Sequence, residues 1–158
     1  MDESVAAMPL EGRFFGQEHR FRCRVYFEDT DLSGVVYHAN YLRYMERARS
    51  AMLRAAGIAQ RAAFEAGEGA YAIRDLTIRY SAPARLDDTL TVVSRLITLR
   101  QASVVIQQRV IRDGLTLTHA QVEAAFVAPS GRPRRQPASW IAAFTPLIWQ
   151  GEHENTWN

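Results

Sequence analysis

The first patterned stretch of the chain alternates between apolar and polar positions. Its apolar side chains share one face of an extended chain: they are Phe21, Cys23, Val25 and Phe27. A period of two is typical of a half-buried strand. We therefore predict a strand here, with Tyr26 on the opposite face and with Cys23 as a buried, unreactive thiol.

From Asn40 the apolar period lengthens to three and four residues, which is typical of one buried stripe on a helix. The stripe consists of Tyr41, Met45, Ala48, Met52 and Ala56. Asn40 is a candidate for the N-terminal cap, and Gly57 is a candidate for the residue that ends the helix. At 1.5 Å per residue such a helix is about 25 Å long.

The remaining pattern is mostly strand-like and is punctuated by turns. Strands are predicted over 76–80, 89–99, 104–110 and 115–127. Asp113-Gly114 predicts a two-residue hairpin. Residues 129–131 predict another turn, and a short helix is predicted over 138–144.

One long helix against a mostly antiparallel sheet indicates an α+β architecture. We predict a leader over 1–19 that is flexible, a single domain over 20–145 and a tail over 146–158. One helix cannot cover both faces of such a sheet, and its edges stay open. Association with further copies of the chain is the natural remedy.

The amino-acid composition excludes several classes of catalytic chemistry and binding site. The chain has 158 residues, a net charge of +2 and 19 basic residues, all of them Arg. Without Lys, Schiff-base chemistry and a Walker-type phosphate loop are excluded. The single cysteine excludes intrachain disulfides and multi-cysteine metal sites, and it suits a reducing compartment. We expect no secretory signal, no transmembrane segment and a cytoplasmic location.

The loop after the first strand is the most unusual segment. Glu28, Asp29 and Asp31 place three acids within four residues, and such crowding together with burial is expected to raise a carboxyl pKa. Asp29 is interpreted as a turn or capping residue. Asp31 lies just before the helix start, where unpaired N–H groups would polarise a carbonyl oxygen. An Asp-x-Asp pair alone does not predict a metal site.

Two further groups of side chains are candidates. His38 lies beside the helix start and could exchange a proton, whereas His119 is interpreted as structural, and His19 and His153 fall in the predicted ends. Arg132, Arg134 and Arg135 form a basic turn that could bind phosphates. The chain lacks the larger basic and aromatic surface expected for nucleic-acid binding.

Residues 24–49, RVYFEDTDLSGVVYHANYLRYMERAR, strongly resemble the signature of hotdog-fold acyl-CoA thioesterases, specifically the Tol-Pal-associated and 4-hydroxybenzoyl-CoA thioesterase family. Residues 79–88 and 131–134 are also similar. The resemblance implies a long helix wrapped by a curved antiparallel sheet. It further implies dimers joined edge to edge, often paired into tetramers, with active sites at the dimer interface.

By position, Asp31 matches the family's catalytic carboxylate and His38 matches its histidine beside the helix start. The backbone N–H near position 38 matches the amide that polarises the thioester carbonyl. Many members of the subgroup have Tyr where this chain has Phe27, so a role proposed for that hydroxyl is unfilled here. Arg132, Arg134 and Arg135 are the candidates for the nucleotide phosphates.

The resemblance therefore predicts hydrolysis of an acyl-CoA thioester, with Asp31 either as general base or as nucleophile. Coenzyme A is part of the substrate, and no metal or other cofactor is expected. The predicted assembly is a homodimer or homotetramer, and peripheral contact with the inner membrane is left open. Two alternatives remain: an acyl-CoA-binding or scaffold protein, and a hotdog dehydratase acting on acyl-carrier-protein substrates.

Overall fold

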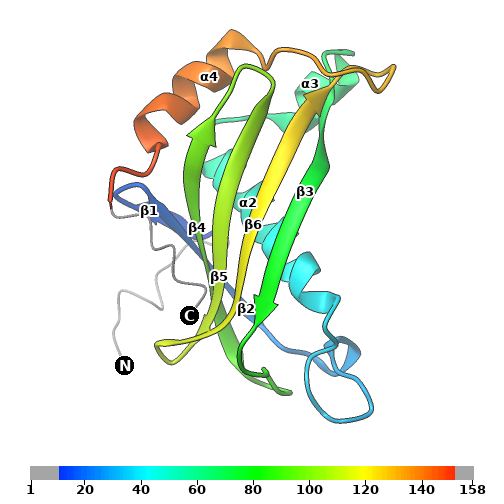
Figure 1. Cartoon of the computed structure of the whole chain (residues 1–158), viewed down its shortest axis with the longest axis vertical. Coiled ribbons are helices and arrows are strands. Elements are labelled where there is room, and N and C mark those ends of the chain that lie inside the picture. Colours follow the sequence, from blue (N-terminus) through cyan, green and yellow to red (C-terminus); the bar gives the residue numbers. More distant parts are fainter. Residues whose placement is uncertain (1–10, 152–158) are drawn as a thin grey trace.

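The computed structural model describes residues 11–151, in which a six-stranded antiparallel sheet wraps around one long helix (Figure 1). The strand order is β1-β2-β4-β5-β6-β3. The strands are β1 (Arg13–Phe15), β2 (Glu18–Arg24), β3 (Ala70–Tyr80), β4 (Thr89–Leu99), β5 (Ser103–Arg112) and β6 (Leu115–Val127). The predicted α+β hotdog architecture is confirmed.

The long helix α2 spans Asn40–Ala55 and buries the predicted stripe, although Ala56 lies just beyond its end. Gly57 has φ +83°, a left-handed conformation that favours glycine, and its N–H bonds to the carbonyl of Arg54. The predicted cap is wrong: the N-cap residue is Ala39. Asn40 instead donates from Nδ2 to Asp29 Oδ1 at 2.9 Å.

The first predicted strand ends earlier than its apolar pattern suggests. β2 stops at Arg24, and Phe27 begins a short 3-10 helix, η1 (Phe27–Asp29), where it is 82% exposed. The physical cause is Asp29, whose Oδ2 accepts the Tyr26 N–H at 2.8 Å and folds the chain into a tight turn. Phe27 therefore does not share the buried face of Cys23 and Val25.

Residues 11–19 and 146–151, which belong to the predicted leader and tail, are part of the fold. Within 11–19, β1 and the start of β2 form a hairpin in which Phe14 and His19 stack at 5.1 Å between ring centroids. At the other end, the backbone N–H of Trp149 donates to the backbone carbonyl of Leu96. The centroid of the Trp149 ring lies 3.9 Å from Cζ of the Arg95 guanidinium. Residues 1–10 and 152–158, including His153, lie outside the described part of the chain.

Three short helices complete the fold. They are α3 (Gln60–Glu65), α4 (Ala138–Phe144) and the 3-10 helix η2 (Thr145–Leu147). α4 has the predicted bounds, whereas α3 was not predicted. The predicted hairpin at Asp113-Gly114 is confirmed, with φ of 48° and 79° at its two residues.

The core consists of two hydrophobic clusters that share α2 and are divided by polar side chains. The cluster at the start of α2 includes Tyr41 and Met45, and the cluster at its end includes Met52 and Leu53. Between them His19, Ser94 and Gln108 are fully buried on neighbouring strands. We call these three residues the polar layer.

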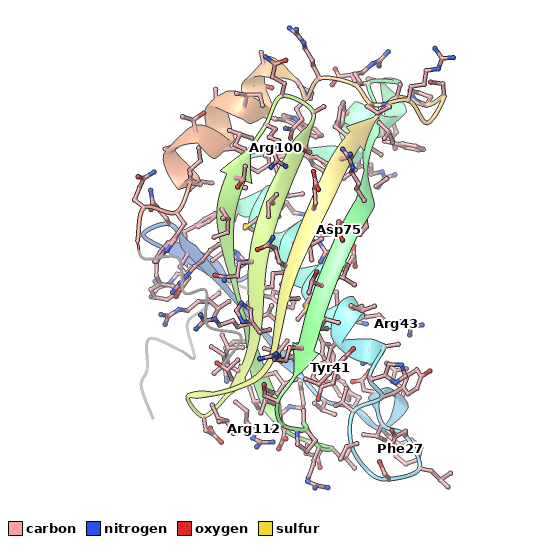
Figure 2. The ribbon with its side chains drawn as sticks, viewed as in Figure 1. Phe27, Tyr41, Arg43, Asp75, Arg100 and Arg112 are labelled. Atoms are coloured by element: carbon pink, nitrogen blue, oxygen red, sulfur yellow. The ribbon has the colours of Figure 1, made fainter. Side chains whose placement is uncertain are left out.

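β3 is a long edge strand. It pairs with β6 along one side only, and most of its residues are exposed. Such an edge offers a row of backbone N–H and C=O groups to another strand. The register of its pairing with β6 shifts between Ile73 and Asp75, and Figure 2 labels Asp75 midway along β3.

Candidate active site

The candidate site is the loop that joins η1 to the start of α2. Backbone hydrogen bonds shape it: Asp31 N–H donates to the Val35 carbonyl at 2.9 Å, and Gly34 N–H donates back to the Asp31 carbonyl at 3.0 Å. Gly34 has φ +81°, which this reversal requires. Figure 2 shows Phe27 in the same loop, at the end of the molecule where α2 begins.

Asp29 is the structural acid of this loop, as predicted. It is buried, and its two carboxylate oxygens accept from Tyr26 N–H and from Asn40 Nδ2 at 2.8 and 2.9 Å. Burial and the nearby Asp29 carboxylate raise the pKa of the Tyr44 hydroxyl. Both oxygens are therefore committed to holding the loop against the helix.

Asp31 is fully exposed and points to solvent beside this fixed frame. Its Oδ1 accepts from both the hydroxyl and the backbone N–H of Ser33. These hydrogen bonds, with a smaller contribution from the charge of His38, hold the pKa of the Asp31 carboxyl below its ordinary value. The predicted rise in pKa is wrong for Asp31, because hydrogen bonding to the charged form prevails.

His38 lies at the rim of a hollow of about 300 Å³ between the start of α2 and the end of β3. The hollow is lined by Val36, His38, Tyr41, Tyr80, Ser81, Ala82 and Pro83. Tyr80 Oη donates to the backbone carbonyl of His38 at 2.7 Å, and the two rings meet edge to face. Tyr80 was missed as a site residue, although its alternation with Leu76 and Ile78 already placed it on the face toward the helix.

The start of α2 faces this region without a side-chain cap. No acidic residue lies in its first turn, and Ala39 makes no side-chain capping bond. A helix start of this kind has a positive dipole end and N–H groups available to an acceptor. An oxygen that gains negative charge would be stabilised there.

The structure separates the basic turn from Asp31 within one chain. Arg132, Arg134 and Arg135 follow β6 at the end of β3 opposite to the Asp31 loop (Figure 1). Arg134 Nη1 donates to the carbonyls of Gly67 and Glu68 at 3.3 and 2.6 Å, which fixes its side chain. The structure thus brings Asp31 and His38 together but places the arginines about one strand length away.

A second hollow, of about 160 Å³, lies near that far end between α2 and β3. Its lining includes Glu46, Arg49, Ser50 and Tyr71. Arg49 donates from Nη1 to Gln108 Oε1 at 2.9 Å, and burial lowers the pKa of its guanidinium. No sequence motif singled out this hollow, because its lining comes from five separate elements.

The structure also describes the surroundings of the other residues that the sequence analysis considered. Cys23 is a free thiol, and burial raises its pKa to about 12, which agrees with an unreactive side chain. His119 is buried in β6, as expected for a structural residue. Within 11–151, no three His, Cys, Asp or Glu side chains are grouped to hold a metal ion. Over the same residues, every helix is too short or too polar to cross a membrane.

Comparison with known proteins points to one family. The model described as "Thioesterase superfamily" matches residues 33–119. The acyl-CoA thioester hydrolase YbgC of Escherichia coli is 42% identical over 127 residues, which are 79% of this chain and 94% of the relative. The acyl-CoA thioesterase YbgC of Haemophilus influenzae is 41% identical over 107 residues, 68% of this chain and 79% of the relative.

Comparison with solved structures also finds thioesterases. A probable thioesterase from Bartonella henselae is 38% identical, with a TM-score of 0.72 over 76% of this chain and 99% of that one. The 4-hydroxybenzoyl CoA thioesterase of a Pseudomonas species is 23% identical, with a TM-score of 0.73 over 80% of this chain and 98% of that one. The second similarity establishes the shared fold.

Proposed function

This chain belongs to the thioesterase superfamily, and from that premise we propose that it hydrolyses an acyl-CoA thioester to a carboxylic acid and coenzyme A. The observation that carries the proposal is the pairing of an exposed, ionised Asp31 carboxylate with the uncapped start of α2. The similarity to acyl-CoA thioester hydrolases supports the same substrate.

The start of α2 is proposed to polarise the thioester. With the acyl carbonyl in the hollow beside His38, its oxygen lies toward the backbone N–H groups near position 38 and gains negative charge as the carbon is attacked. Donors that are already oriented toward such an oxyanion are worth about 10²–10³-fold in rate.

Asp31 is proposed to supply the attack, either by removing a proton from water or by attacking the carbonyl carbon directly. Both roles need an ionised carboxylate, which an aspartate carries at neutral pH, and the lowered pKa of Asp31 extends that state to more acidic pH. Because Ser33 occupies only Oδ1, the second oxygen stays available. The carbon–sulfur bond then breaks, and the coenzyme A thiolate takes up a proton, for which His38 is the candidate donor. In the direct route, water then hydrolyses the mixed anhydride between the acyl group and Asp31, which releases the carboxylic acid and restores the carboxylate.

The active form is proposed to be a dimer, with a homotetramer as a further stage. The edge of β3 would pair with β3 of a second copy about a two-fold axis near Asp75, which continues the sheet across both chains. An isologous antiparallel pair places the Tyr71 end of one strand beside the Tyr80 end of the other. The Arg132–Arg135 turn of one chain would then approach the Asp31 loop of its partner and could contact the nucleotide phosphates.

We propose that the reaction needs no metal or other cofactor, since coenzyme A enters as part of the substrate. We also propose a cytoplasmic location, because acyl-CoA thioesters are handled there and the chain has one unpaired cysteine. Any contact with the inner membrane would be peripheral.

The test is thiol release from a panel of acyl-CoAs with short, long and aromatic acyl groups, measured for the native sequence and for Asp31→Asn. Turnover that falls by about 10²-fold or more in the variant supports the proposal. Equal rates in both proteins, or an enoyl product in place of free thiol, would contradict it. Sedimentation of the same samples measures the dimer.

A further inference from the structure

The hollow beside Arg49 contains a half-buried cation with little to neutralise it. Within residues 11–151, the guanidinium of Arg49 has one hydrogen-bond partner, the neutral amide of Gln108, and no carboxylate oxygen within 4 Å. The nearest acid, Glu46, is exposed at the mouth and accepts a hydrogen bond from Ser50 Oγ at 3.1 Å. A half-buried charge in this state favours an incoming anion.

Gln108 holds the guanidinium in place. Its Nε2 donates to the carbonyl of Met45 at 2.9 Å and to Ser94 Oγ at 3.0 Å, and its Oε1 accepts from Arg49. Because both N–H groups of this buried amide donate and its oxygen accepts, the side chain has little freedom. Arg49 is thereby held in the lining of the hollow.

The rest of the hollow suits a short acyl chain. Its wall includes Leu53, Val104, Ile106 and Ala124, which are apolar and belong to the cluster at the end of α2 or border it. A volume of about 160 Å³ accommodates a small acyl group rather than a long fatty chain. The cation lies beside a slot that is apolar on its β5 and β6 side, with Glu46, Ser50 and Gln60 also in its lining.

The hollow is too far from Asp31 of the same chain to serve it. Arg49 lies nine positions after Asn40 in α2, which is about 14 Å along the helix. In the proposed dimer, however, Tyr71 at this hollow comes beside Tyr80 of the partner, and Tyr80 lines the hollow at the reacting end. One site would then combine the loop of one chain with the Arg49 hollow of the other.

We propose that Arg49 of one chain binds the terminal carboxylate of a short dicarboxylic acyl group whose thioester lies against Asp31 of the partner chain. This inference rests on the proposed function and names its substrate class. The guanidinium forms a two-pronged, charge-assisted contact with the carboxylate, so Arg49 is a specificity-determining residue.

The first experiment compares glutaryl-CoA with 5-methylhexanoyl-CoA, which has the same shape but ends in two methyl groups. We expect the native protein to prefer glutaryl-CoA by at least about 10-fold in kcat/KM. Arg49→Met should lose about 10²-fold on glutaryl-CoA and keep its rate on the neutral isostere, which shows that the variant is folded. Arg43→Met, on an exposed arginine of the same helix, is the matched control and should change neither rate (Figure 2).

The outcomes separate the two proposals. A native protein that hydrolyses the isostere as well as glutaryl-CoA overturns the carboxylate assignment and leaves the thioesterase proposal standing. A protein that hydrolyses neither these two nor any other member of the acyl-CoA panel fails the thioesterase proposal itself. If Arg49→Met does not fold, the preference of the native protein decides alone.

A second experiment tests the contribution of two chains. Asp31→Asn and Arg49→Met chains, each expected to lose about 10²-fold or more on glutaryl-CoA, are co-expressed with different affinity tags, and the mixed dimer is isolated. Each mixed dimer holds one site with both residues intact, so about half of native turnover per dimer should return. No recovery in mixed dimers would overturn the placement of Arg49 across the interface.

Discussion

The two hollows between α2 and β3 differ in how the charged side chains near them are held. At the start of α2, Asp31 is exposed and depends on its own loop for orientation. Farther along the helix, Arg49 is half-buried and is held from below by the core amide of Gln108. The comparison teaches that the reacting group is kept accessible, while the recognition group is anchored in the fold.

The largest expected effect is at the exposed end. Asp31→Asn removes the ionised oxygen and should lower kcat/KM by about 10²–10⁴-fold, as measured by thiol release. Its side chain is exposed and bonds within its own loop, so thermal unfolding should shift very little. A large drop in the melting temperature would show that Asp31 carries structure as well as chemistry, which would weaken the contrast between the two ends.

The next effect is at the anchored end. Gln108→Leu fills the volume but leaves the Arg49 guanidinium and the Met45 carbonyl without their partner, so the free energy of unfolding should fall by about 3 kcal/mol. Urea titration followed by circular dichroism measures it. Gln107→Leu, the neighbour on the opposite face of β5, is the control and should cost far less.

Asp29→Asn sharpens the comparison within the loop itself. The change places an amide against two donors, Tyr26 N–H and Asn40 Nδ2, and should cost about 1–2 kcal/mol of stability. The measurement is the urea midpoint beside that of Asp31→Asn. A stability loss at Asp31 larger than the loss at Asp29 would reverse the assigned roles.

The smallest effect concerns pH. Because the folded-state pKa of Asp31 is lowered, its carboxylate stays ionised as pH falls below the ordinary aspartate pKa, and activity is lost only when pH falls through the lowered value. Ser33→Ala removes the largest cause of that lowering, so the acidic limb of the kcat/KM profile should move to higher pH. An unmoved limb would assign the limb to another group.

The sequence predicted the elements whose patterns are local. The alternation over 115–127 and the stripe on α2 translate directly into β6 and the buried helix face, because each reports the burial of its own segment. Phe27 shows where this fails: its apolar character continued the strand pattern, while two hydrogen bonds to Asp29 turned the chain away. A side-chain hydrogen bond to the backbone is invisible to periodicity.

The candidate site also has one part that the sequence could predict and one part that it could not. Asp31 and His38 lie within one contiguous motif and could be selected from it. The Arg49 hollow could not, because its lining comes from α2, α3 and three strands and its charge balance depends on a glutamine 59 positions away. Hydrophobic pattern says nothing about which polar groups meet in a core.

The polar layer has an evolutionary consequence. His19, Ser94 and Gln108 divide the interior into two clusters, one at the start of α2 and one at its end. Substitutions in one cluster that lie far from the other should therefore combine nearly additively with substitutions in the other. Substitutions near Leu53 and Ile106 could therefore reshape the hollow for a different acyl group, while the turn that contains Asp31 keeps its conformation. Substrate preference could then change through substitutions in one part of the chain, while the reaction itself is conserved in another part.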